Sequence, residues 1–213
     1  MRTKYNPFVV ASPLEQHYLT RICQVAEICY ERGWVWATSG NFSVHLRDGL
    51  VWQSPSGKCK GHLKPEDFLP VSLETAQVIR PEPGLKASEE MPVHLGIFDE
   101  FSGAKCVVHA HPQELVAASE QDLEFNGQEM QKALGSYDYS QRLKIRVAPN
   151  QSRDTIAQFC KEDMKPYLHP EAGMVVFARH GVYAWGHDPF DALKKIEAIE
   201  FLCKSTKNVR SVS

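Results

Sequence analysis

Short apolar runs alternate with amphipathic stretches along the chain, and two of these runs are joined directly by a tight turn. In FSVHLRDGLVWQS (42–54), Asp48-Gly49 separates two alternating segments, which predicts a β-hairpin. Strands that alternate with helices but include a hairpin indicate a mixed sheet with helices on both faces. The sequence therefore predicts an α/β fold in three layers, α/β/α.

The remaining elements follow from periodicity and from helix-start signals. Ser12, Pro13 and Glu15 supply an N-cap, an N-terminal proline and a capping box for a first helix that ends at Gly33. Further strands are expected at LPVS (69–72), QVIR (77–80), KCVVHAH (105–111), LKIRV (143–147) and GMVVFAR (173–179). Further helices are expected over about 89–101, from Pro112, across 152–168, and from Asp188-Pro189 to about Lys207.

Length and charge limit the kinds of partner. The chain has 213 residues, enough for one domain with a single core, which we expect to span 1–213. Its 24 basic and 26 acidic residues nearly cancel, and no run of five like charges occurs, so neither nucleic acid nor an anionic membrane is an expected partner. We expect a small-molecule ligand.

The lack of a recognisable targeting signal and the use of cysteine lead us to expect an intracellular protein. The N-terminus has no apolar segment of signal-peptide length, and no run reaches 18 apolar residues, so we expect a cytoplasmic location. The six cysteines include no C-x-x-C pair and mostly have apolar neighbours, which is typical of reduced thiols. Cys59, in a polar loop, is the one exception among them.

Two histidines end the apolar run KCVVHAH. Side chains alternate faces along a strand, so His109 and His111 point the same way, as two ligands of one metal would. A surface pair or a hydrogen-bonded core pair has the same spacing. A catalytic zinc site needs a third protein ligand, and His180 is the best remaining histidine because it follows an apolar strand and precedes a glycine.

Two loops have the composition of phosphate sites. ATSGNFS (37–43) and SPSGK (54–58) combine glycine with hydroxyl and amide side chains, and Lys58 and Lys60 lie nearby. Ordinary turns use the same residues. For a general acid or base the candidates are Glu89, Glu90 and Glu129, although most helical glutamates are solvated surface residues.

In this order the motifs resemble the class II aldolase and adducin family, over roughly residues 14–205. ATSGNFS and SPSG resemble its two phosphate loops, SEEMPVH its acidic helix start, HAH its metal pair, and RHGVYAWG the segment with its third histidine. The resemblance implies a class II aldolase-like, mostly antiparallel sheet. It also implies one Zn²⁺ per subunit, held by His109, His111 and His180.

Within this family the chain most resembles the sugar-phosphate dehydratases, through RGWVWATSGNFS, SGKCKGHLKPEDF, NGQEMQKALG and ARHGVYAWG. The resemblance implies dehydration of 5-methylthioribulose 1-phosphate to 2,3-diketo-5-methylthiopentyl 1-phosphate in methionine salvage. Glu129 matches their proposed acid/base. The position of Glu90 holds the catalytic glutamate in the aldolases and a substrate-contacting residue in the dehydratases.

The same resemblance implies that a sugar phosphate is bound and that the chain forms a homo-oligomer, with a homotetramer typical of the family. It assigns phosphate contacts to Ser39, Gly40, Asn41, Ser56, Gly57 and Ser88. Two positions depart from the pattern: HAHPQELVA replaces the HTHS of the dehydratases, and Glu89 stands where aldolases have a phosphate-binding serine. A carboxylate at that position would repel a phosphate.

Two other functions remain open. Zinc-stabilised enolate chemistry also serves sugar-phosphate aldolases and epimerases, which makes such an enzyme the first alternative. The second is a non-catalytic interaction domain like the adducin head, which the intact set of His109, His111 and His180 argues against.

Overall fold

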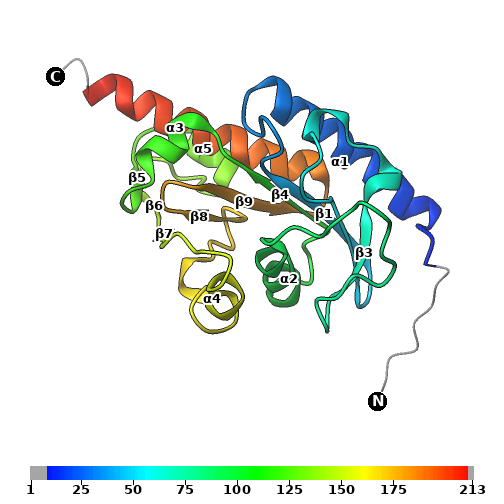
Figure 1. Ribbon diagram of the computed structural model, residues 1–213. Helices are drawn as coiled ribbons and strands as arrows, with labels where there is room; N and C mark the ends of the chain where they lie inside the picture. The colour runs from blue at the N-terminus through cyan, green and yellow to red at the C-terminus, as the bar shows by residue number, and fades with distance from the viewer. Residues whose placement is uncertain (1–8, 211–213) are drawn as a thin grey trace.

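A seven-stranded sheet forms the middle layer of the computed structural model, which describes residues 9–210 (Figure 1). The strand order is β3-β2-β1-β4-β9-β8-β7, and every neighbouring pair is antiparallel except β7 and β8, which are parallel. The predicted mixed, mostly antiparallel sheet is therefore confirmed. Its strands are β1 (Asn41–Arg47), β2 (Leu50–Gln53), β3 (Leu69–Ser72), β4 (Cys106–Ala110), β7 (Val147–Ala148), β8 (Met174–Phe177) and β9 (Gly181–Gly186).

Helices cover both faces of the sheet, which confirms the three layers. On one face, α1 (Pro13–Glu31) and α5 (Pro189–Arg210) pack against the sheet through residues such as Ile22 and Ile199. On the other face, α2 (Met91–Glu100) and α4 (Ile156–Glu162) pack through residues such as Ile97 and Phe159. Figure 1 places α3 (Gln113–Ala118) on the same side as α5, and the small sheet of β5 (Leu123–Phe125) and β6 (Leu143–Ile145) at one end.

The N-cap and hairpin predictions are confirmed in detail. The Ser12 hydroxyl accepts a hydrogen bond from the Glu15 N–H, and the Glu15 carboxylate accepts one from the Ser12 N–H. The turn at Asp48-Gly49 joins β1 to β2, with Gly49 at φ +71° as such a turn requires. These local signals were readable because they involve residues only a few positions apart.

Four expected elements differ from the structure. LKIRV is not one strand, because Leu143–Ile145 form β6 in the small sheet and Val147–Ala148 form β7 in the main sheet. QVIR forms no strand: Val78 makes a single bridge to Val71, and the prolines at 81 and 83 lack the N–H groups that a longer ladder needs. The helix expected over 89–101 is shorter, as Met91–Glu100, and the one expected over 152–168 is reduced to Ile156–Glu162 with a 3₁₀ turn at Lys165–Tyr167. All six cysteines are free thiols, as predicted. None of the helices within residues 9–210 is both long and apolar enough to cross a bilayer.

Candidate metal centre and phosphate cavity

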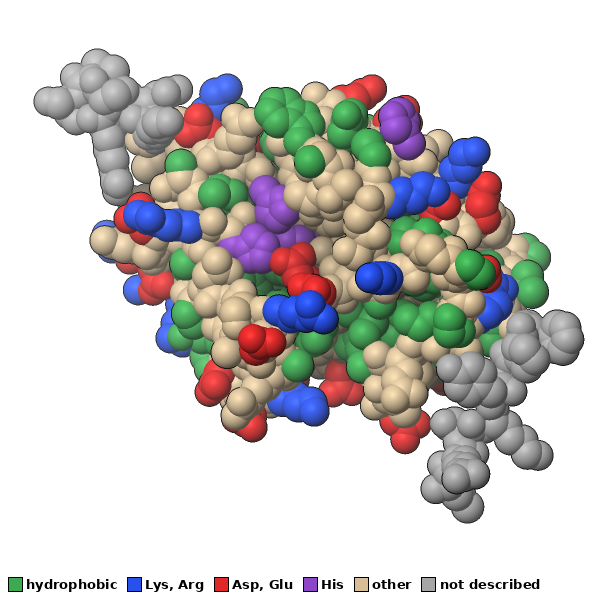
Figure 2. Space-filling view, viewed as in Figure 1, with side chains coloured by type: hydrophobic (Ala, Val, Ile, Leu, Met, Phe, Trp, Pro, Cys, Tyr) green, Lys and Arg blue, Asp and Glu red, His purple; other side chains and the backbone are tan. Residues whose placement is uncertain are grey.

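Three histidines meet at the ends of two neighbouring strands in the middle of the sheet. His109 belongs to β4, His111 follows that strand, and His180 lies in the turn between β8 and β9. Since β4 and β9 are antiparallel neighbours, the end of one strand adjoins the start of the other. One ring nitrogen from each histidine lies within 4.8 Å of the others. Figure 2 shows histidine side chains gathered near the middle of one face, beside acidic side chains.

Hydrogen bonds fix the ring tautomers of two of these histidines. His109 Nδ1 lies 3.0 Å from the Val182 carbonyl, which only accepts, so Nδ1 carries the proton. His180 Nδ1 donates in the same way to Asn150 Oδ1 at 3.1 Å. The Asn150 oxygen also accepts from the Gln151 N–H, which sets the orientation of its amide. The Nε2 lone pairs therefore remain for a metal.

Burial keeps the histidine pair neutral. Burial lowers the pKa of His109 well below its usual value, and it lowers the pKa of His111 to about 4. Their Nε2 atoms lie 2.9 Å apart, so both face the same point at the strand end. Three imidazoles with a cavity beside them suit a catalytic zinc or a similar divalent ion. The predicted triad thus fits a metal.

Glu90 lies against the triad. One carboxylate oxygen is 2.9 Å from His180 Nε2, and the other is 3.4 Å from His109 Nε2. The second oxygen also accepts a hydrogen bond of 2.6 Å from the Asn41 amide. Burial opposes ionisation of Glu90, but His109, His180 and Asn41 hold its pKa well below the usual range. Glu90 is therefore an ionised carboxylate at the histidines.

A cavity of about 340 Å³ opens over the histidines. Both predicted phosphate loops and the start of α2 line it, together with His111, His180 and Glu90. The structure thus brings together most of the predicted substrate contacts, namely Ser39, Gly40, Asn41, Ser56 and Ser88. Gly57 adjoins Ser56 in the second loop but does not line the cavity.

Gly40 lets the first phosphate loop pack closely against β4, the strand that carries His109. Its φ is +72°, and a Cβ atom there would lie 2.5 Å from Val35 Cγ1 and 2.8 Å from the His109 carbonyl oxygen. Any side chain would therefore push the loop away from β4. This close approach places the loop backbone beside the strand that carries His109.

Lys60 supplies a buried positive charge to the same cavity. Its side chain is 1% exposed, and its Nζ donates to the carbonyls of Thr38 and Lys58 at 2.9 and 2.8 Å. These carbonyls belong to the two loops, so the ammonium holds the loops together. Burial lowers the pKa of Lys60 to about 8, against the opposing charges of Cys59 and Glu90. An ammonium has three N–H groups, which leaves one for a ligand in the cavity.

Glu89 lies at the mouth of the cavity, in an ion pair with Arg153 at 2.9 Å. Its side chain is 55% exposed and that of Arg153 is 74% exposed, so water also screens the charge. The repulsion expected between Glu89 and a phosphate is therefore offset by Arg153.

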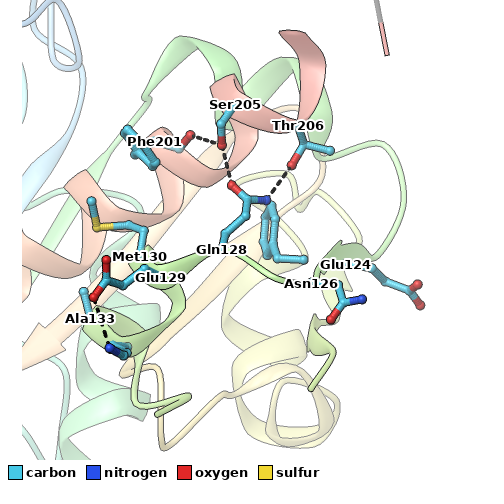
Figure 3. A pocket seen from close by; sticks show the side chains of 11 residues that line it. Glu124, Asn126, Gln128, Glu129, Met130, Ala133, Phe201, Ser205 and Thr206 are labelled. Carbon is cyan, nitrogen blue, oxygen red and sulfur yellow. Dashed lines mark hydrogen bonds and ion pairs between the residues drawn. The ribbon is translucent and has the colours of Figure 1, made fainter. Parts of the chain in front are cut away.

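Glu129 lies elsewhere in the chain. It begins a 3₁₀ helix, η3 (Glu129–Leu134), where its 79% exposed side chain pairs with Lys132. It lines a separate surface groove of about 960 Å³ that also includes Met130 and Phe201 (Figure 3). Glu129 is not one of the described residues that line the histidine cavity.

Sequence reasoning missed two residues that organise the site. His94 is fully buried and hydrogen-bonds Asn41, although its position four residues after Glu90 on one helical face was a usable signal. Asn150, which orients His180, follows β7 and reaches the site only because β7 pairs with β8. No local pattern indicates that pairing.

The chain is similar to several known proteins in sequence and in fold. The family described as Class II Aldolase and Adducin N-terminal domain matches residues 20–206. A methylthioribulose-1-phosphate dehydratase from Methylococcus capsulatus is 35% identical over 80% of this chain and 83% of its own, and one from Pseudomonas fluorescens is 33% identical over 90% and 93%. The crystal structure of L-fuculose-1-phosphate aldolase from Thermus thermophilus has a TM-score of 0.72 and 26% identity, covering 92% of this chain and 96% of its own.

Proposed function

The chain belongs to the class II aldolase and adducin family, and on that premise we propose that it is a zinc-dependent hydro-lyase acting on 5-methylthioribulose 1-phosphate. The product would be 2,3-diketo-5-methylthiopentyl 1-phosphate, within methionine salvage. The relatives at 33 and 35% identity bear the corresponding dehydratase name over most of their length. The observation that carries the proposal is a single cavity at the histidine triad that is also lined by groups able to donate hydrogen bonds to a phosphate.

One end of the cavity suits a metal. His109, His111 and His180 would hold one zinc ion through Nε2, since the Nδ1 atoms of His109 and His180 are already engaged. Bound there, zinc would supply Lewis-acid polarisation of the substrate carbonyl oxygen. The low pKa of His111, about 4, means that its lone pair is free at neutral pH.

The other end suits a phosphate monoester. Lys60 provides the buried cation, and Ser56 and Ser88 provide hydroxyl donors in the same cavity. A phosphate dianion would accept the remaining Lys60 N–H as a charge-assisted hydrogen bond. Gly40 and its neighbours would add backbone N–H groups.

The reaction needs proton transfers at adjacent carbons. The C3 proton lies beside the C2 ketone and is taken by a carboxylate, while the C4 hydroxyl leaves as water after receiving a proton. The enol left at C3 then gains a proton at C4, which yields the second ketone. Glu90 touches this part of the cavity, where it would contact the substrate. By the resemblance to the dehydratases, Glu129 exchanges the protons.

Glu129 must then come from another copy of the chain. Within one chain it lies in the groove beside η3, away from the histidine cavity. Met130 and Phe201 border the same groove and are 36 and 50% exposed, which suits a contact between copies. We therefore expect a homo-oligomer, with the tetramer of the resemblance as its form, in which each cavity receives a neighbour's Glu129.

A sugar-phosphate aldolase is the second candidate. Glu90, at the position where the aldolases keep their catalytic glutamate, is the carboxylate that lies at the histidines in the single chain. A 26% identical fuculose-phosphate aldolase also shares the fold.

A substrate panel separates the two reactions. Zinc-loaded protein is offered 5-methylthioribulose 1-phosphate and a set of ketose and deoxysugar phosphates. Formation of a dicarbonyl product from the first compound is expected. An aldehyde fragment from another compound would replace the dehydratase by an aldolase, and zinc content near zero in the purified protein would favour the non-catalytic alternative.

A further inference from the structure

A buried row of hydrogen bonds runs from the sheet to the candidate site. The Ser43 hydroxyl lies 2.6 Å from His94 Nδ1, and His94 Nε2 hydrogen-bonds Asn41 Oδ1. Asn41 Nδ2 in turn lies 2.6 Å from Glu90 Oε2. Ser43 and His94 are 0% exposed and Asn41 is 3% exposed, so water does not substitute for any of these partners.

The donor and acceptor of each hydrogen bond follow from Glu90, which ends the row. The Glu90 carboxylate only accepts, so the Asn41 amide must present its NH₂ group to it. The Asn41 oxygen then faces His94 and needs a donor, which places the ring proton on Nε2. His94 Nδ1 is left as an acceptor for the Ser43 hydroxyl proton. One arrangement of protons satisfies all four groups.

We infer that His94 is a positioning residue of this site: as a neutral ring protonated at Nε2, it holds the Asn41 amide so that its NH₂ group faces Glu90. An amide rotated by half a turn would instead point its oxygen at a carboxylate, and the two would repel. The inference rests on the proposed function only for its kinetic test.

The surroundings of His94 support a neutral ring. Burial lowers its pKa to about 3, and Glu90 is the charged group that opposes this shift. The Tyr183 ring meets His94 edge to face at 5.5 Å between centroids and carries no charge near neutral pH.

Nitrogen NMR of ¹⁵N-histidine-labelled protein tests the ring state without any activity. The His94 signals, identified by their loss in His94→Gln, should have the pattern of a neutral Nε2–H ring from pH 8 down to pH about 5. A ring protonated at Nδ1, or a charged ring at pH 7, would overturn the inference. If that variant folds poorly, through-bond and through-space correlations in the wild-type protein identify the His94 signals instead.

Two substitutions separate positioning from packing. His94→Gln keeps an N–H donor near the place of Nε2, whereas His94→Leu fills the volume with apolar atoms and removes the donor. We expect kcat of the glutamine variant within about three-fold of wild type and a loss of about 10- to 100-fold in the leucine variant, with little change in KM. Zinc content should stay the same in both.

His45→Gln is the matched control, since His45 lies on the same strand as Ser43, but its ring hydrogen-bonds the Leu50 carbonyl at 2.9 Å and packs against Phe98, away from Asn41 and Glu90. Its kinetics should match wild type. A leucine variant as active as the glutamine variant would assign His94 to packing and overturn the positioning role. If wild type proves inactive on every sugar phosphate, the proposed function fails, while the NMR result still decides the tautomer.

Discussion

His180 Nε2 lies 2.9 Å from a carboxylate oxygen of Glu90, so the nitrogen that a metal would use is also the nitrogen that faces the site's ionised carboxylate. A metal held by that nitrogen would therefore lie next to a negative charge, which favours its binding. The three histidines and Glu90 form one electrostatic unit.

Alanine at His109, His111 or His180 should remove the metal and the activity together. Each ring contributes one nitrogen to a cluster whose atoms lie within 4.8 Å of one another, and two ligands hold zinc much more weakly than three. Metal content by mass spectrometry of purified variants checks this. The exposed His17 on α1 provides the control, because His17→Ala should retain full zinc. Full occupancy in His180→Ala would remove that residue from the site.

Lys60→Met should raise KM for the phosphate substrate by about 10- to 100-fold with a smaller effect on kcat, because an ion pair to the phosphate is lost from a buried site. In wild type, KM should rise as the pH passes through about 8, since the bound form is the ammonium. The variant should lack this pH dependence. Steady-state kinetics between pH 6 and about 9.5 measure both effects.

Lys58→Met is the control for this experiment, because Lys58 pairs with Asp67 and does not line the cavity. The stability of the wild-type protein should also depend on pH through Lys60. The pKa of Lys60 is lower in the folded than in the unfolded chain, so the unfolded chain binds more protons and folding stability rises with pH above about 8. A KM that is independent of pH in wild type would exclude Lys60 from phosphate binding.

Ser56→Ala and Asn41→Ala should differ in kinetics. Ser56 faces the cavity, so losing its hydroxyl should raise KM more than it lowers kcat. Asn41 also donates to Glu90, so its removal should lower kcat as well. The separate values of kcat and KM measure the split. Unchanged kinetics in both variants would refute the phosphate assignment of these loops.

Gly40→Ala should destabilise the fold by about 1 to 3 kcal/mol and weaken metal binding, because the methyl group would meet Val35 and the His109 carbonyl. Gly49→Ala is a matched control. Gly49 has nearly the same φ, +71°, but among the described residues, apart from its two chain neighbours, no atom lies within 4 Å of the place that a Cβ would take, so only backbone strain is added. Urea unfolding and zinc titration compare the two. Equal losses of stability and zinc affinity in the two variants would mean that the contact between Gly40 and β4 is unimportant.

Elements of the fold could be predicted from the sequence wherever they depend on residues that are close together in the chain. The capping box at Ser12 and Glu15 and the turn at Asp48-Gly49 depend on neighbours in the chain, and both occur as predicted. The same-face geometry of His109 and His111 follows from the period of a strand. Their meeting with His180 needed the motif order of the family, because strand pairing across more than 60 residues has no local signature.

The contacts that could not be predicted from the sequence join residues that are far apart in the chain. Asn150 orients His180 from a loop 30 residues away, and His94 reaches Asn41 across 53 residues. QVIR has strand composition, yet the prolines beyond it end the ladder after one bridge. Nothing in the sequence indicates that Arg153 would pair with Glu89 and so offset its charge at the cavity mouth.

Glu129→Gln should keep zinc and substrate affinity but lose about two to four orders of magnitude in kcat, the usual contribution of a positioned acid/base. Glu90→Gln should be milder if the dehydratase assignment is right. The amide keeps the size and most hydrogen bonds of the carboxylate but cannot exchange a proton. The opposite ranking, measured on equally zinc-loaded preparations, would favour the aldolase, with its base at Glu90.

Mixing two inactive variants tests whether a neighbour supplies Glu129. Glu129→Gln keeps the histidine cavity intact, and His111→Ala keeps Glu129 in its groove. Co-refolded oligomers of the two should recover a fraction of wild-type activity, because some cavities combine a full triad with a neighbour's Glu129. Mixing Glu129→Gln with a double variant that carries both substitutions is the control and should recover none. If the first mixture also stays inactive although mass spectrometry detects mixed oligomers, no cavity receives Glu129 from another copy, and proton transfer must be assigned to Glu90.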